Sequence, residues 1–440
     1  MSILAVRGGK PLMEKFDLPE EMFRWPVLTE KSEAAVLDVL RNNKISGNDI
    51  TVRFEREFAE WNRTKHAVCA TNGTMALEAA MFAAGLKAGD EIICPTKTYW
   101  ASCLAAQKLG IAVVFANVDP DTVCLCPDDL ERCLSPWTRA VIAVHYWAHP
   151  CDMDRICEFC RRHGLKLIED VSHAQGGHYK GKKLGTFGDV AAMSLMSQKS
   201  FSAGEFGILV TDDDEIYERA LAYLHYERNN EQNIHEPELM PYMHMPLGAM
   251  KGRANQMCAA LALEQLKIYD ERTAEIRKAL NYFWDRLEGC PGVHGIRVDE
   301  SDGSDMAGWY VPHFTYRPEE TGVGFHAFCD AVSAEIAWKI PLGGNYPLHT
   351  HPIFQTWDPM GLGKPARIAF AHRDVRALDA ALGPSERILC AEVPYFRRFI
   401  PNEIDKIADG FLKVVENLDQ LRGSDDEPEI LSEGQWYGKV

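Results

Sequence analysis

One lysine of this 440-residue chain follows a short apolar run, in a position where an amine can act as a nucleophile. Lys199 comes just after Val190–Leu195, which has the composition of a buried strand. A lysine at the end of such a strand is poorly placed for simple solvation, and a partly desolvated amine has a lowered pKa. Such an amine forms a Schiff base with a carbonyl compound. Lys199 is therefore the first candidate for a catalytic residue.

An acidic residue occupies the corresponding position after a second apolar run. Asp170 ends the stretch Leu165–Asp170, and in a parallel sheet the carboxyl ends of the strands face the crevice that binds ligands. Pyridoxal phosphate (PLP) requires a carboxylate against its pyridine nitrogen, because the protonated ring is the electron sink of its chemistry. Asp170 meets that requirement, and its neighbour Glu169 is expected to point the other way. The alternative is that Asp170 only caps the next helix.

Two further turns follow predicted strands. Thr71–Thr74 joins a strand end to a helix start, where free N–H groups and the helix dipole suit a phosphate and Gly73 permits close approach. A capped helix without any ligand has the same pattern. In Pro95–Trp100, Tyr99 could stack on the pyridine face, and core packing is the alternative for that ring.

Alternating strands and helices must position these residues. Between Lys65 and Asp214, short runs that are apolar on both faces alternate with helical patterns, which indicates a buried, largely parallel sheet covered by helices. The predicted strands are Ala67–Ala70, Glu91–Cys94, Val113–Val118, Ala140–Val144, Leu165–Glu169, Val190–Leu195 and Gly207–Thr211. The helices predicted between them include Thr74–Gly85, Ala101–Leu109, Asp128–Leu134 and Asp152–His163.

The rest of the chain predicts a long loop and a second domain. Arg228–Lys251 has no steady period, and a loop of that length is usually functional or mobile. A helix over Gln256 to about Leu287 is expected to lead from the sheet domain into a smaller α+β domain. We expect a large domain over 1–270 that includes an N-terminal arm, a smaller one over 271–422, and a polar tail over 423–440 that is partly disordered. In the smaller domain, Gly308–Tyr316 is a predicted strand, and Phe325–Ile336 and Glu403–Leu418 are predicted helices.

Composition excludes several classes of function. A net charge of −17 argues against nucleic acid as a partner, and no apolar run is long enough for a membrane helix. The first residues lack a signal-peptide pattern, and 13 cysteines without a framework spacing indicate reduced thiols, so we expect a cytoplasmic protein. Cys157, Cys160 and His163 form one cluster, but no second cysteine pair lies nearby to complete a zinc site, and we expect no metal.

The ordered set of phosphate turn, aromatic residue, aspartate and lysine resembles the DegT/StrS sugar aminotransferase family, which has the PLP fold of type I. The resemblance runs from about Leu37 to about Tyr282. It is nearest to members that act on keto-cyclitols or related carbocycles, or make an aminated benzoate precursor, because of the longer C-terminal half with Tyr346–Phe354. The matching stretches are Phe54–Ala59, Thr71–Leu77, Gly89–Pro95, Val118–Thr122, Val144–His145, Asp152–Asp154, Ile168–Asp170, Tyr179–Asp189 and Gly207–Thr211.

The resemblance implies a role for each matching residue. Lys199 is the implied Schiff-base lysine and Asp170 the partner of the pyridine nitrogen. The other implied contacts to PLP are the backbone of Gly73 and Thr74 at the phosphate, the Ser194 hydroxyl at the phosphate, His173 at the ring 3-oxygen, and Tyr99 on the ring face.

The chain departs from the family pattern at two positions. Phe206 stands where glycine is common after the lysine and puts a large side chain near the site. Lys251 stands where the family has an asparagine that reaches a phosphate across the dimer interface. Lys251 either replaces that asparagine as a cationic phosphate ligand or is an ordinary solvated loop charge.

The implied activity is a ping-pong transfer of an amino group from glutamine or glutamate to a keto-cyclitol or ketosugar by a homodimer, as in amino-sugar, aminocyclitol or antibiotic biosynthesis. A nucleotide ketosugar is the alternative acceptor. A PLP-binding regulator without turnover and a PLP lyase or racemase remain open. Lys199 counts against the dehydratase branch of the family, in which histidine replaces the lysine.

Overall fold

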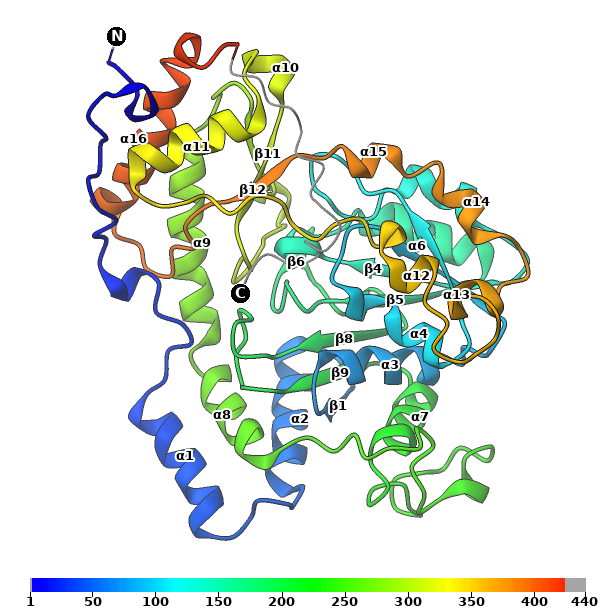
Figure 1. Ribbon diagram of the computed structural model, residues 1–440. Helices are drawn as coiled ribbons and strands as arrows, with labels where there is room; N and C mark the ends of the chain where they lie inside the picture. The colour runs from blue at the N-terminus through cyan, green and yellow to red at the C-terminus, as the bar shows by residue number, and fades with distance from the viewer. Residues whose placement is uncertain (1, 424–440) are drawn as a thin grey trace.

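The computed structural model describes residues 2–423, and its centre is a seven-stranded sheet (Figure 1). The strand order is β1-β9-β8-β5-β4-β2-β3, and β9 alone runs against its neighbours. All seven predicted strands form, which confirms the mostly parallel sheet of the predicted fold class. Their bounds are β1 His66–Ala70, β2 Glu91–Pro95, β3 Ala112–Ala116, β4 Thr138–Val144, β5 Lys166–Asp170, β8 Val190–Ser194 and β9 Gly207–Thr211.

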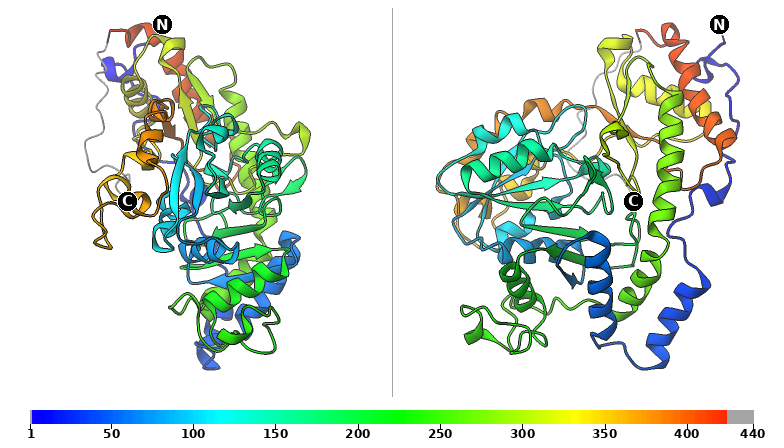
Figure 2. Two further views of the ribbon diagram at one scale, coloured as in Figure 1. Left: turned by 90° about the vertical axis from the view of Figure 1, so that its right-hand side faces the viewer. Right: turned by 180° about the vertical axis from the view of Figure 1, so that it is seen from behind.

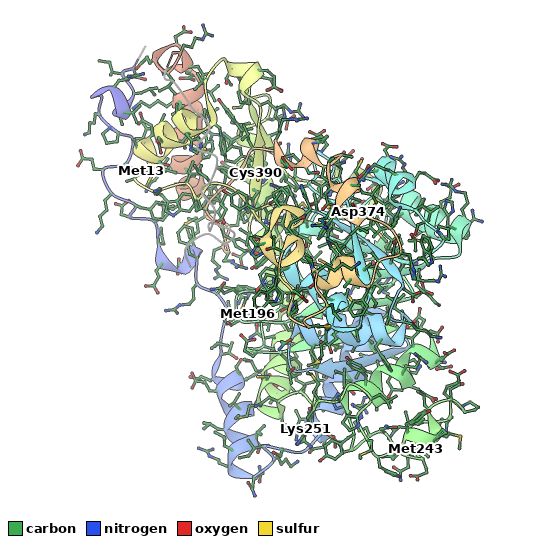
Figure 3. The ribbon with its side chains drawn as sticks, turned by 45° about the vertical axis from the view of Figure 1, so that its right-hand side comes forward. Met13, Met196, Met243, Lys251, Asp374 and Cys390 are labelled. Carbon is green, nitrogen blue, oxygen red and sulfur yellow. The ribbon has the colours of Figure 1, made fainter. Side chains whose placement is uncertain are left out.

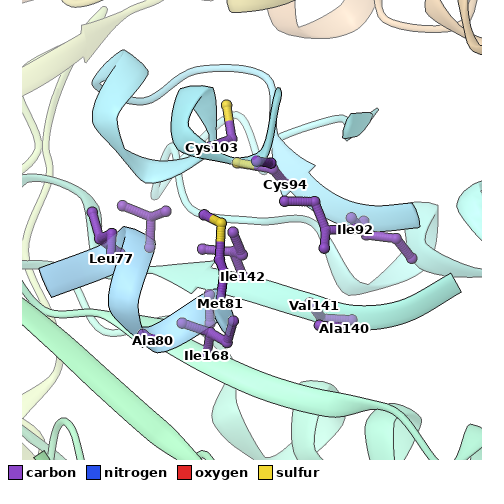
Figure 4. Close-up of a cluster of buried hydrophobic side chains, with 14 of the residues drawn as sticks. Leu77, Ala80, Met81, Ile92, Cys94, Cys103, Ala140, Val141, Ile142 and Ile168 are labelled. Carbon is purple, nitrogen blue, oxygen red and sulfur yellow. The ribbon is translucent and has the colours of Figure 1, made fainter. Parts of the chain in front are cut away.

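Successive residues of a central strand face two different cores. In β8, Val190 and Ala192 lie in one apolar cluster, while Ala191 and Met193 lie in the other. Because side chains alternate along a strand, both faces of the sheet must be covered by helices. Figure 4 shows part of the first core, where Leu77 and Met81 of one covering helix lie close to Ile142 of β4. The two buried faces explain why these strands are apolar throughout.

The covering helices follow capping rules. The Asn72 side chain accepts a hydrogen bond from the Met75 N–H at the start of α3, and Asp152 does the same for Arg155 at the start of α6. The helices of this unit are α1 Glu30–Arg41, α2 Asp49–Asn62, α3 Gly73–Ala83, α4 Leu104–Lys108, α5 Leu130–Cys133, α6 Met153–His163, α7 Asp214–Leu224 and α8 Gln256–Leu266; the β6 His178–Tyr179 and β7 Lys182–Lys183 pair forms a small hairpin.

A second, antiparallel sheet of β10, β11 and β12 follows the long helix α9 in the chain and lies beside it (Figures 1 and 2). The N-terminal arm runs beside this part of the molecule, where Ala5 N–H donates to Glu335 on α11. The elements are α9 Tyr269–Arg286, β10 Val293–Gly295, β11 His313–Tyr316, α10 Pro318–Thr321, α11 Phe325–Ile336, α12 Pro352–Gln355, α13 Ala366–Ala369, α14 Val375–Asp379, α15 Gly383–Glu386, β12 Cys390–Glu392 and α16 Pro401–Val415.

Two predicted elements differ from the structure. The helix expected over Gln256 to Leu287 is two helices, interrupted at Lys267–Ile268. The strand expected from Gly308 begins only at His313, because Trp309 and Val311 have positive φ values of 47° and 49°, which no strand residue adopts. The predicted loop at 228–251 is irregular apart from one turn at Met240–Tyr242. The predicted tail beyond 423 lies outside the described residues, and the domain boundaries at 270 and 422 stay predictions.

Three other observations bear on the composition argument. All 13 cysteines are free thiols. No three His, Cys, Asp or Glu side chains within residues 2–423 are arranged to hold a metal ion. Among the same residues, no helix is both long and apolar enough to cross a membrane.

Candidate active site

Lys199 is buried within the loop that joins β8 to β9. Its side chain amine lies 4.0 Å from the ring centroid of Tyr310, and the Trp25 indole N–H donates a 2.8 Å hydrogen bond to its backbone carbonyl. Burial lowers the pKa of Lys199 to about 7, and the nearby Asp170 charge opposes that effect only in part. The amine is therefore substantially unprotonated near neutral pH, which is the form that attacks a carbonyl carbon.

Asp170 ends β5 in the middle of the sheet, where its backbone pairs with Val144 of β4 and Ala192 of β8. The Ser102 hydroxyl donates a 2.7 Å hydrogen bond to one carboxylate oxygen, and the Ser172 N–H donates at 3.1 Å to the other. A carboxylate accepts about four hydrogen bonds in all. Asp170 therefore keeps acceptor capacity for a protonated ring nitrogen.

The preceding residue, Glu169, points to the other side of the strand, as expected. Its carboxylate contacts His145 Nε2 at 3.1 Å and accepts N–H bonds from Gly185, Phe187 and Gly188 at 2.7–2.8 Å. Burial by itself would raise the pKa of Glu169, but the contact with His145 and these N–H donors outweigh it, and the pKa lies below its usual range. Glu169 holds the 185–188 turn and has no capacity left for a ligand.

The predicted phosphate turn packs directly against the end of β8. A Cβ on Gly73 would lie 2.5 Å from the Ser194 Cβ, and a Cβ on Gly207 would overlap the Asn72 carbonyl group. Any side chain at either glycine would push the turn away from the strand end. The first N–H groups of α3, including that of Thr74, are thus held beside Ser194, whose own N–H donates to the Ser172 hydroxyl at 2.9 Å.

His173 is buried between aromatic rings, with centroids 4.4 Å from Tyr310 and 5.4 Å from Tyr146. Its Nδ1 accepts a 3.2 Å hydrogen bond from the Trp147 N–H, so the proton of the neutral ring lies on Nε2. Burial, followed by the charge of Lys199, holds the pKa of His173 well below its usual range. His173 is therefore a neutral donor and suits a ring oxygen.

The two remaining predicted residues, Tyr99 and Lys251, are more exposed than this group. Tyr99 is 41% exposed and lies against Trp100, at the start of the turn that carries Ser102. Lys251 is exposed, its ammonium lies 5.5 Å from the Tyr226 ring centroid, and Figure 3 shows it well away from Met196 of the Lys199 loop.

The segment beside Lys251 still contacts the phosphate turn, because the Thr71 N–H donates to the Gly252 carbonyl at 3.2 Å. The other departure, Phe206, is fully buried 5.7 Å from the Phe54 ring, within an aromatic cluster of the second core. Its large side chain therefore fills the core of the domain.

Three contacts of the site were missed from the sequence. Tyr310, which covers the Lys199 amine, lies in an irregular segment of the second unit, and Trp25 comes from the N-terminal arm. Ser102, the hydrogen-bond donor to Asp170, follows Tyr99 by three residues in a turn that was predicted only as helix. No sequence spacing links these residues to Lys199 or Asp170, since each contact is made by folding.

A comparison with protein families identifies the chain. Residues 26–361 match the model of the DegT/DnrJ/EryC1/StrS aminotransferase family. The chain belongs to this family. It is a PLP-dependent aminotransferase with the type I fold, as the residues of the site and the sheet predicted.

Two curated relatives and one solved structure show how far the similarity extends. GDP-perosamine synthase of Escherichia coli O157:H7 is 33% identical over 75% of this chain and 85% of its own length. L-glutamine:2-deoxy-scyllo-inosose aminotransferase of Streptomyces kanamyceticus is 31% identical over 94% of this chain and 97% of its own. An aminotransferase structure from Psychrobacter cryohalolentis has a TM-score of 0.74 and 25% identity, and covers 90% of this chain and 100% of its own.

The residues present fit PLP. A buried amine with a pKa of about 7 lies within electrostatic reach of a buried carboxylate that has spare acceptor capacity. A glycine at position 73 lets the N-terminus of α3 approach the Ser194 hydroxyl, which leaves N–H donors for a phosphate. The donor set therefore matches the aldehyde, the ring nitrogen and the phosphate of one cofactor.

Proposed function

We propose that the enzyme transfers the amino group of glutamine or glutamate to a keto-cyclitol or a closely related ketosugar in a ping-pong cycle. The observation that carries this proposal is the extent of similarity to the 2-deoxy-scyllo-inosose relative, which spans 94% of this chain and includes its C-terminal third. The GDP-perosamine synthase alignment spans 75%. A nucleotide ketosugar is the second candidate acceptor, because GDP-perosamine synthase has the higher sequence identity of these two relatives, 33% against 31%.

When bound, PLP supplies the electron sink for the carbanion that forms at the substrate carbon. With PLP bound, Asp170 would keep the ring nitrogen protonated, and the His173 Nε2–H would suit the ring oxygen. Lys199 would hold the cofactor, and its free amine would serve as the acid and base that moves a proton at the substrate carbon. The Tyr310 ring over the amine keeps bulk water from the site of proton transfer.

We propose a homodimer as the working unit. The segment that contains α1 exposes several large apolar side chains, at Leu28, Leu37 and Leu40, beside an apolar hollow lined by Val36 and Leu261. Contiguous exposed apolar groups of this kind mark association surfaces. In such a dimer Lys251 would reach the phosphate of the partner's site, in place of the family asparagine.

A half-reaction screen tests the proposed substrates. Holoenzyme mixed with glutamine or glutamate should lose the absorbance band of the lysine-bound cofactor, and a keto-cyclitol should restore it. If only a nucleotide ketosugar restores the band, the acceptor is a nucleotide ketosugar and not a keto-cyclitol. A band that responds to no amino acid would favour a regulator without turnover, and product formed without a keto acceptor would indicate a lyase or racemase.

A further inference from the structure

Lys97 is a buried lysine of the active-site region that the proposed cycle does not use. It lies just beyond the carboxyl end of β2 and is 5% exposed. No carboxylate within residues 2–423 lies within 4.0 Å of its ammonium, and no hydrogen bond from that ammonium is formed to any of them. Such a group is unusual, because a lysine is almost never buried to this extent unless it is paired.

The other buried cations of the described chain show how this cost is normally met. Arg228 pairs with Glu55 at 2.9 Å, and Arg367 pairs with Asp379 at 2.6 Å. The remaining three lie over aromatic rings, at 3.9 Å for Lys183 on Trp61, 4.0 Å for Lys199 on Tyr310 and 3.3 Å for Arg397 on Tyr395. Among the buried cations of residues 2–423, Lys97 has neither kind of partner.

The backbone at Lys97 is fixed on both sides. The hydroxyl of Thr96 contacts His349 Nδ1 at 2.6 Å, and its carbonyl accepts the Leu348 N–H at 2.6 Å. On the other side, the Thr98 hydroxyl contacts that of Ser102 at 2.9 Å, and Ser102 donates to Asp170. Lys97 is thus held by the same hydrogen-bond network that positions the carboxylate for the cofactor ring.

The Lys97 charge acts on residues of the second sheet that face the site. Burial lowers the pKa of His313 on β11 to about 3, and the Lys97 charge adds to that effect. The His313 ring stacks on Trp147 with centroids 3.5 Å apart. Burial raises the pKa of the Cys390 thiol on β12, and the Lys97 charge opposes that rise. The pKa of His173 is lowered by burial, by the charge of Lys199 and, to a smaller extent, by His313. Lys97 therefore borders the same space as the catalytic lysine, from the side of β2.

The carboxylate beside His313 forms no ion pair with Lys97. Glu392 lies 4.0 Å from His313 Nε2, opposite it on the paired strands β11 and β12. Burial raises the pKa of Glu392 to about 7, and no cation contributes to that shift. Within residues 2–423 the charge of Lys97 is thus left for a molecule that enters the site.

We propose that Lys97 binds a carboxylate group of a substrate. This inference rests on the proposed aminotransfer and adds a recognition element to it. Two sources carry the required chemistry: the α-carboxylate of the amino donor, and an acid group on a keto acceptor. In either case the enzyme selects against the uncharged analogue, because binding it leaves the ammonium unpaired.

The test compares Lys97→Met, Lys97→Arg and the wild-type holoenzyme, with Lys182→Met as a control at an exposed lysine that lies over Phe187. Single-turnover conversion is measured with glutamine and with its α-carboxamide, and then with neutral and carboxylated keto-rings as acceptors. We expect K97M to raise the half-saturating concentration of the carboxylated substrate about 10- to 100-fold. This factor corresponds to the loss of one charge-assisted hydrogen bond. The maximal rate and the uncharged analogue should be unaffected, and K97R should restore most of the loss.

The donor and acceptor arms identify which carboxylate is bound. An equal loss with the charged and the uncharged partner, or no loss with either, would overturn the proposal. The proposal would also be overturned if K97M lowered the melting temperature or altered the oligomeric state and left the substrate preference unchanged. Lys97 would then stabilise the fold or contact the partner subunit. We expect the melting temperature to be unchanged or higher, because an unpaired buried charge is removed.

Equilibrium binding of glutarate separates this inference from the proposed function. Titration calorimetry on the holoenzyme needs no turnover, and K97M should lose most of the affinity that wild type and K182M show. If wild type converts no amino acid but this difference remains, only the proposed function fails. If wild type converts glutamine and K97M behaves identically in both assays, only the inference fails.

Discussion

Glu169 and Asp170 are adjacent, both carry a carboxylate and both are buried, yet the two sides of β5 use them for opposite purposes. On one side, Glu169 contacts His145 and receives three backbone N–H bonds. On the other, Asp170 receives one hydroxyl and one N–H. A buried carboxylate whose acceptor sites are all used stabilises a fold, whereas one with sites unused can bind a ligand.

This difference teaches that hydrogen-bond saturation, more than burial or charge, separates structural from functional acids in this sheet. Lys199 lies on the Asp170 side, and its amine likewise has no ion pair within the described residues. If this comparison holds, changes on the Asp170 side of β5 should reduce turnover, and changes on the Glu169 side should reduce stability.

The largest effect is expected from Lys199→Met. Without the amine there is no covalent cofactor attachment and no proton carrier, so transfer should fall below detection. Borohydride treatment of the variant with PLP should label nothing, as measured by mass spectrometry. The apoprotein should melt several degrees higher, because a desolvated amine is replaced by an apolar chain. Labelling of the variant at another lysine would show that the amine has been misassigned.

Asp170→Asn should come next. An amide cannot hold the proton on the pyridine nitrogen, so we expect turnover to fall about 10²–10⁴-fold while the cofactor still attaches to Lys199. Stopped-flow absorbance with the amino donor measures this loss. The melting temperature of the apoprotein should change little, and a variant with near-normal turnover would remove the distinction between the two carboxylates.

Glu169→Gln should show the reverse pattern. Three N–H donors would meet a side chain with only one acceptor atom, so we expect a loss of roughly 2–4 kcal/mol in the free energy of unfolding. Urea denaturation measures it. For the fraction that remains folded, turnover per attached cofactor should stay within a few-fold of wild type. A selective loss of turnover without destabilisation would contradict the structural role.

The pH dependence of cofactor capture tests the Lys199 side without a mutation. Since burial places the pKa of Lys199 at about 7, the rate at which apoprotein captures PLP should fall about tenfold per unit below pH 7 and level off above it. The unfolded chain keeps the ordinary value of 10.5, so it binds more protons than the native chain between 7 and 10.5. Through this window the group makes stability rise with pH. A midpoint of capture near 10 would show a solvated amine.

The smallest effect is expected from Ser102→Ala, which removes one hydrogen bond from Asp170. The carboxylate would be held less firmly, so turnover should fall about three- to tenfold with no change in cofactor attachment. Steady-state kinetics with saturating substrates measures this. Ser172→Ala offers a matched comparison, because it removes a hydroxyl that contacts Ser194 instead of Asp170.

The sequence predicted the fold and the reactive groups well because both depend on local patterns. The runs that are apolar on both faces became the seven strands, and Phe325–Ile336 became α11 with the bounds predicted. The break at Lys267–Ile268 was not visible, since the apolar spacing continues through it. Nor was the late start of β11, which depends on residues in positive φ near the site.

The sequence by itself determined that a lysine and an aspartate follow buried strands, because the apolar pattern of a strand and the residues of a turn lie within a few neighbouring positions of the chain. Only the tertiary structure decided which groups complete the site. Tyr310 covers the Lys199 amine, Ser102 donates to Asp170, and Lys97 has no ion-pair partner among residues 2–423. These contacts join segments far apart in the chain, and burial, hydrogen-bond saturation and charge pairing are properties of the packed molecule, which no single segment contains.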